Sequence, residues 1–178
     1  SFLRHADEQS LAALAAVARA ARDLPQAADG WAVVAGPRYL GRAGTAASLH
    51  TYYQEGAWGV SPHLIPHRSL HGVSGSVSLG LKSRGPNFGA GGGPGAAGDA
   101  LVTAVALLAE GGLPGVWVVA TGWQPESVPD RGGGVPSPAD CLALALALAP
   151  SGTSRCVFRL EVGPGGDGKR LEIEELMD

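Results

Sequence analysis

The run ALVTAVALLA, residues 100–109, is the feature that most constrains the fold. Its residues favour a helix, and that helix is apolar on every side except at Thr103. A helix with no polar face must be covered on all sides, so we expect it to lie between two layers. Its predicted span is Ala96 to Glu110, where Gly111 and Gly112 end it.

Short strands are predicted around this helix. Asn87 to Ala90 precedes it, and the strongly β-branched GVWVVATGW, Gly115 to Trp123, follows it as a central strand. Trp31 to Ala35 is a third, buried strand. Strands that alternate with helices indicate an α/β fold.

Three further segments are predicted to be helical. Leu11 to Arg22 is alanine-rich and amphipathic. A second helix runs from Thr45, its expected N-cap, to about Gln54, and a third stretch covers His67 to Leu79. The apolar stripe of the first helix consists of Leu11, Leu14, Val17 and Ala18.

The segment CLALALALA, residues 141–149, allows two structures. Alanine and leucine are strong helix formers, and the preceding Ser-Pro-Ala-Asp resembles a capping box. However, leucine alternates with alanine, and only a strand places all the leucines on one face. We favour the strand. After it, RCVFRLEV (155–162) and RLEIEEL (170–176) are expected to form a C-terminal β-hairpin.

Composition excludes several classes of function. With 178 residues the chain is expected to form one domain. Its charged residues (16%) are sparse and scattered and give a net charge of −3, which argues against a nucleic-acid partner. No apolar run approaches the roughly 20 residues that span a membrane, and the charged start SFLRHADEQ is unlike a signal peptide. We therefore expect a cytoplasmic protein with no membrane segment and two reduced thiols, Cys141 and Cys156. Whether residues precede Ser1 is left open.

A series of motifs resembles the N-terminal half of β-ketoacyl synthases, the condensing enzymes of the thiolase fold. The motifs are P-x-x-I-P at Pro62 to Pro66, S-x-x-L-G-L-x-x-x-G-P-N ending at Asn87, and G-D-A at Gly98 to Ala100. The resemblance covers roughly Leu11 to Glu126. It implies that residues 1–178 are a single truncated ketosynthase-like domain, a thiolase-like half-domain with a mixed sheet and helices on both faces.

In that family the turn after G-P-N carries a nucleophilic cysteine, because a thiolate at a helix N-terminus can accept an acyl group from a thioester. Here the position falls on Pro94, between Gly93 and Gly95, and proline offers neither a nucleophile nor an N–H. The family's two catalytic histidines belong to its C-terminal half, whereas every histidine here lies before residue 72. The resemblance therefore implies a degenerate, non-catalytic protein without a cofactor, like chain-length-factor subunits.

The sequence contains two other candidate sites. The glycine turn lacks the Lys-Ser/Thr of a phosphate-binding Walker loop and the order of the dinucleotide motif, which leaves an acyl-thioester pocket or simple close packing of backbones. The spacing of His63, His67 and His71 would align three imidazoles on one helix and is a weak candidate for zinc. Pro66 interrupts that span, so packing or surface histidines are favoured and no metal is expected.

The resemblance suggests a partner role. The corresponding strand of the family pairs across the dimer axis, which would place Asn87, Phe88, Gly89 and Ala90 at an interface. We expect a homodimer, or a heterodimer with a ketosynthase-like subunit, in polyketide- or fatty-acid-type biosynthesis, with acyl carrier protein as a further partner. A small protein or enzyme that binds acyl-CoA or acyl carrier protein, and a purely structural scaffold, are the alternatives. Pathway and acyl substrate are left open.

Overall fold

The computed structural model describes residues 6–24, 29–62, 64–126, 131 and 139–150, and all structural statements refer to them. The predicted C-terminal hairpin and Cys156 lie outside these residues. No helix in the described ranges is both long enough and apolar enough to cross a membrane.

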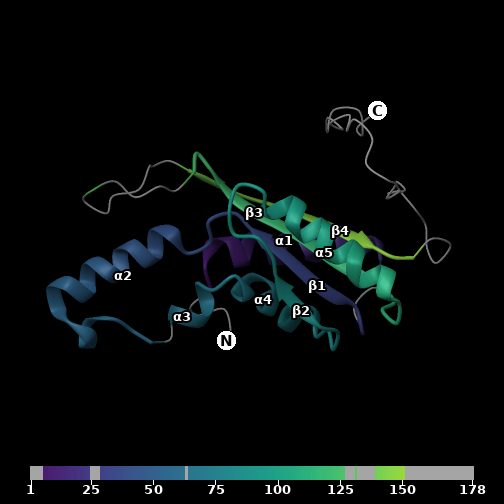
Figure 1. Cartoon of the computed structure of the whole chain (residues 1–178), viewed down its shortest axis with the longest axis horizontal. Coiled ribbons are helices and arrows are strands. Elements are labelled where there is room, and N and C mark those ends of the chain that lie inside the picture. The colour runs from purple at the N-terminus through teal and green to yellow at the C-terminus, as the bar shows by residue number, and fades with distance from the viewer. Residues whose placement is uncertain (1–5, 25–28, 63, 127–130, 132–138, 151–178) are drawn as a thin grey trace.

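A mixed four-stranded sheet forms the centre of the fold (Figure 1). Its order is β2 (Asn87–Gly89), β1 (Ala32–Pro37), β3 (Val116–Gln124) and β4 (Asp140–Leu148). β1 is parallel to both of its neighbours, and β4 is antiparallel to β3. The prediction of a strand for the Leu-Ala alternation is confirmed, as is the central position of β3.

Helices cover both faces of the sheet, as the predicted fold class requires (Figure 1). α1 (Glu8–Ala20) and α4 (His71–Leu81) pack on one face, and α5 (Ala96–Glu110) packs on the other. A 3-10 turn, Ala21–Asp23, extends α1. The predicted bounds of α5 agree with those observed.

A helical arm, α2 (Arg42–Glu55) with the 3-10 turn η3 (Ala57–Gly59), projects from this layered body (Figure 1). The prediction of Thr45 as its N-cap is wrong. The helix begins one turn earlier because Gly41 adopts a left-handed conformation, with φ 68°, and its carbonyl accepts a hydrogen bond from Thr45 N. The guanidinium of Arg68 then ties the helix to the body through Gly44 O and Ser48 Oγ.

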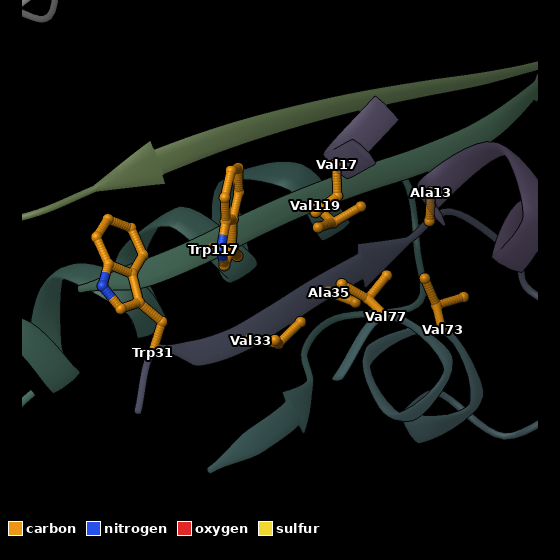
Figure 2. Close-up of a cluster of buried hydrophobic side chains, with 9 residues drawn as sticks. All are labelled: Ala13, Val17, Trp31, Val33, Ala35, Val73, Val77, Trp117 and Val119. Carbon is orange, nitrogen blue, oxygen red and sulfur yellow. The ribbon is translucent and has the colours of Figure 1, made fainter. Parts of the chain in front are cut away.

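One hydrophobic cluster lies between the sheet and the pair α1 and α4 (Figure 2). Trp31 and Trp117 meet there with ring centroids 5.8 Å apart. The cluster's buried members are Ala13, Val17, Trp31, Val33, Ala35, Val73, Val77, Trp117 and Val119.

The predicted stripe of α1 is partly wrong. Leu11 is 45% exposed and Ala18 is also exposed, whereas Gln9 and Ser10 are buried. The helix is rotated from the predicted orientation because Gln9 has buried polar partners beneath it, including Thr121. Polar contacts of this kind are invisible to an apolar pattern.

A second cluster lies under α5. Ala100 and Ala104 pack against strand residues Ala32, Val34, Val116 and Val118. The opposite side of the helix is open, since Val102 is 70% exposed and Ala106 is exposed as well. The expectation that this helix is covered on all sides is therefore not met within the described part of the chain.

Candidate functional site

The glycine turn between β2 and α5 lies at the carboxyl ends of the parallel strands. Ala90 N donates to Ala35 O at 2.8 Å, and Tyr39 N donates to Gly92 O at 3.1 Å. Gly91 and Gly92 have φ values of 76° and 106°, which side chains rarely tolerate. Backbone hydrogen bonds thus hold the turn to β1 and to the segment directly after it.

Several glycines in and around this turn allow backbones to approach closely. A Cβ atom at Gly36 of β1 would lie 2.2 Å from Ala96 O, and one at Gly89 would lie 2.3 Å from Leu70 O. A Cβ at Gly91 would lie 2.7 Å from Ala96 Cα. This geometry supports the close-packing interpretation of the glycine run.

The predicted nucleophile position, Pro94, carries no reactive group. Pro94 is exposed, and Gly95 is the N-cap residue of α5 without a side-chain hydrogen bond. Asp99 is the acidic residue of the first turn, where it complements the helix dipole. The assignment of Gly93, Pro94 and Gly95 as a degenerate elbow remains a prediction.

Cys141 does not supply the missing thiol. In β4 it lies on the same face as Ala145 and Ala147, which pack on the α1 side of the sheet, so its side chain is on the face opposite α5. Burial, followed by the negative charges of Asp7 and Glu8, raises the pKa of the Cys141 thiol to about 11. It is therefore protonated at neutral pH and unsuited to nucleophilic attack.

An apolar cavity of about 220 Å³ opens between α5 and the sheet, beside the first two turns of the helix. It was not predicted, because it depends on which strand lies next to β3. The alternating leucines of β4 were the one sequence signal for this cavity, because an apolar face of a strand is expected to pack against another apolar surface. The cavity is lined by Ala97, Gly98, Leu101, Val118, Ala120, Leu144 and Leu146.

Two arginines near the turn were also missed. The guanidinium carbon atoms of Arg38 and Arg42 lie 5.7 and 4.9 Å from the centroid of the Tyr39 ring. Arg38 Nε is 2.8 Å from Glu126 Oε2, which neutralises part of this charge. The cluster contains neither a thiol nor an imidazole, so it offers no group for acyl transfer.

His67 and His71 do not share one helix. His67 ends the short helix α3 (Leu64–His67), His71 begins α4, and His63 lies outside the described residues. The predicted helical stretch over His67 to Leu79 is thus divided between His67 and His71. His71 Nδ1 lies 3.4 Å from Ser74 Oγ. Among the residues that the structure describes, no three potential ligands come together to hold a metal ion.

Three of the four predicted interface residues form one edge of the sheet, and Ala90 follows directly after them. Asn87, Phe88 and Gly89 pair with β1 on one side, and no described strand pairs with their other side. Phe88 is 40% exposed, and Asn87 Oδ1 is buried without a hydrogen-bond partner among the described residues. Within the described ranges, the outer edge of β2 therefore has no paired strand.

The fold is shared with one solved structure in particular, a complex of the ketosynthase ApeO with its chain length factor ApeC from Xenorhabdus doucetiae. The TM-score is 0.65 at 19% sequence identity, and the match covers 82% of this chain and 58% of the matched chain. The fold is therefore thiolase-like, as predicted, and the chain spans little more than half of its counterpart. No protein-family model matches the chain, and no curated protein matches it.

Proposed function

We propose that the chain is a non-catalytic, ketosynthase-like partner subunit that acts by dimerisation in polyketide- or fatty-acid-type biosynthesis. The observation that carries this proposal is the open outer side of α5. Val102 is 70% exposed on a helix whose run from Ala100 to Ala109 has only Thr103 as a polar residue. In the thiolase fold the equivalent helix lies between two sheets, so here a second subunit would supply the cover.

The free edge of β2 supports a second contact. Antiparallel pairing with the same strand of a partner would give Asn87, Phe88 and Gly89 backbone hydrogen bonds on both sides. By analogy with a ketosynthase and its chain length factor, the partner would be a second copy or a complete ketosynthase-like subunit.

The absence of catalysis is tested with a condensation assay. We expect the purified chain, given acyl and malonyl thioesters of acyl carrier protein, to release no carbon dioxide and to carry no covalent acyl group by mass spectrometry. The physical reason is that Pro94 has no nucleophile and Cys141 faces away from α5. An acylated Ser or Cys residue would contradict the proposal.

A second candidate function is acyl-thioester binding without a partner. The cavity beside the first turns of α5 favours it, because its lining is apolar and it lies next to the elbow. Thermal unfolding in the presence of acyl-CoA or acyl-carrier-protein thioesters distinguishes the two. Stabilisation that grows with acyl chain length would favour this second function, and flat titrations would favour the partner role.

A further inference from the structure

We propose that the cavity between α5 and the sheet binds a linear hydrocarbon chain that ends in a free carboxylate, and that Arg38 binds this carboxylate at one end of the cavity. This inference goes beyond the proposed partner role and does not rest on it, because the site lies within one chain. It also differs from thioester binding, since the thioester of the same hydrocarbon chain has no charge there for an arginine to bind.

The cavity has an apolar lining that follows one face of the sheet. Val118 and Ala120 of β3 form its floor, together with their partners in β4, Leu146 and Leu144. The first two turns of α5 form the opposite wall. All the side chains of this lining are aliphatic, so the cavity suits a hydrocarbon chain and offers it no polar side-chain group.

Arg38 lies on the same face of the sheet as the cavity. β1 ends at Pro37, but Arg38 N donates to Thr121 O at 2.7 Å and so continues the ladder for one residue. Side chains alternate along a strand, which places Arg38 on the same side as Gly36, where a Cβ atom would meet Ala96 of α5. The Arg38 side chain is therefore on the α5 face.

The stem of Arg38 lies over the strand that forms the floor of the cavity. A Cβ atom at Gly122 of β3 would lie 3.4 Å from Arg38 Cβ and 3.7 Å from Arg38 Cδ. Gly122 follows Ala120 on this face of β3, about 7 Å further along the strand. Arg38 therefore lies beside the end of the cavity that Ala120 lines.

The charged groups around Arg38 favour a single negative charge. The guanidinium carbons of Arg38 and Arg42 both lie near the Tyr39 ring, at 5.7 and 4.9 Å from its centroid. Glu126 Oε2 is 2.8 Å from Arg38 Nε and balances one of these two positive charges. One positive charge is left over within this cluster, which matches a carboxylate better than a phosphate dianion.

The backbone of Arg38 is held in place while its side chain is accessible. Its carbonyl accepts a hydrogen bond from Gln9 Nε2 at 3.3 Å, and the next residue, Tyr39, donates its N–H to Gly92 O in the glycine turn. The Arg38 side chain is 50% exposed. An arginine of this kind can pair with a carboxylate through two parallel hydrogen bonds.

Calorimetric titration with octanoate and octanol at neutral pH tests the site, because the two ligands have chains of equal length and differ in the charge of the head group. We expect the native chain to bind octanoate about 10- to 100-fold more tightly than octanol, which is the usual effect of a hydrogen bond to a charged group. In Arg38→Gln this preference should disappear, while the affinity for octanol should stay the same. The matched control is Arg19→Gln on α1, an exposed arginine on the opposite side of the sheet, which should keep the preference.

A second variant, Gly98→Leu, tests the part of the site that holds the hydrocarbon chain. A Cβ atom at Gly98 meets nothing within 4 Å, so a leucine there can enter the cavity and should weaken the binding of both ligands. Failure of the native chain to bind octanoate, equal affinity for octanoate and octanol, or an unchanged preference in Arg38→Gln would overturn the proposal, as would unchanged binding in Gly98→Leu. If circular dichroism shows that Arg38→Gln does not fold, the two ligands on the native chain and on Gly98→Leu decide.

Discussion

Gly36 of β1 lies against the carbonyl oxygen of Ala96 in the first turn of α5, so closely that a Cβ atom at Gly36 would stand 2.2 Å from this oxygen. The helix that follows the glycine turn therefore rests directly on the backbone of the central sheet. Close approach of the two backbones, rather than a bound ligand, accounts for the glycine at this position.

Replacement of this glycine is expected to unfold or strongly destabilise the protein. Gly36→Ala forces the backbones apart, and overpacking of this kind typically costs about 1–3 kcal/mol or more. The control is Gly98→Ala, where an added Cβ meets nothing within 4 Å and helix propensity should contribute about 0.5–1 kcal/mol of stability. Urea unfolding of both variants checks this, and equal midpoints would contradict the packing described.

The buried polar pair beneath α1 gives a second prediction. Thr121 Oγ1 donates a hydrogen bond of 2.7 Å to Gln9 Oε1. Thr121→Val leaves this buried acceptor without a donor and should lower the free energy of unfolding by about 1–3 kcal/mol. Thr103→Val is the control, because Thr103 Oγ1 bonds only the Asp99 carbonyl of its own, exposed helix turn. A loss at Thr103 as large as that at Thr121 would argue against the pair.

The cap of α1 gives a third prediction. Asp7 Oδ1 accepts a 2.9 Å hydrogen bond from Gln9 N, while burial raises the pKa of the Asp7 carboxyl above its ordinary 3.8. Because the pKa of Asp7 is higher in the folded state than in the unfolded state, protonation of this carboxyl stabilises the fold. This contribution is present below pH 3.8 and is lost as the pH rises through the pKa of Asp7 in the folded state. Asp7→Asn keeps the acceptor and removes the buried charge, so it should match or exceed native stability at pH 7.

The matched variant Asp7→Ala removes the acceptor. It should be less stable than Asp7→Asn by about 1 kcal/mol in urea unfolding. If the two variants unfold at the same urea concentration, Asp7 does not act as a cap.

The thiol of Cys141 should make stability depend on pH in the alkaline range. Its folded pKa is raised from 9.0 to about 11, so its contribution is fully present below pH 9 and is lost as the pH rises through 11. Unfolding midpoints of native protein and Cys141→Ala should therefore converge or cross between these two values. In a Cys156→Ser background, alkylation of Cys141 by iodoacetamide at pH 8 should be slower than that of a free thiol. A constant difference between the midpoints would contradict the raised pKa.

The outer side of α5 is predicted to bind the partner. Val102→Asp should prevent association without unfolding the chain, because Val102 is 70% exposed and a charge there would be buried only in a complex. Leu79→Asp on α4, at a residue that is 62% exposed, is the matched control and should leave association unchanged. Size-exclusion chromatography of both variants, with circular dichroism to verify folding, distinguishes this result from general loss of structure.

Much of the fold followed from periodicity. The Leu-Ala alternation of β4, the β-branched run of β3 and the bounds of α5 all follow from local patterns that burial enforces. The start of α2 did not follow from periodicity, because the left-handed conformation of Gly41 and the contact of Arg68 with Gly44 determine where this helix begins. These depend on contacts distant in sequence.

The candidate site was less accessible to sequence reasoning. The glycine turn before α5 could be predicted from the sequence, and the assignment of Pro94 to the nucleophile position stays a prediction. The cavity beside the turn requires Leu101 of α5 and Leu146 of β4 to be brought together by the sheet order. Likewise, the rotation of α1 that buries Gln9 depends on its hydrogen bond with Thr121, which lies more than a hundred residues further along the chain. No local pattern contains such a pair.

Sedimentation velocity tests the proposed partner role most directly. The chain is measured alone and after coexpression with a complete ketosynthase-like subunit, each with native sequence and with Val102→Asp. We predict a two-chain species in at least one of the two native samples and its loss in the variant. A monodisperse monomer in both native samples would contradict the account.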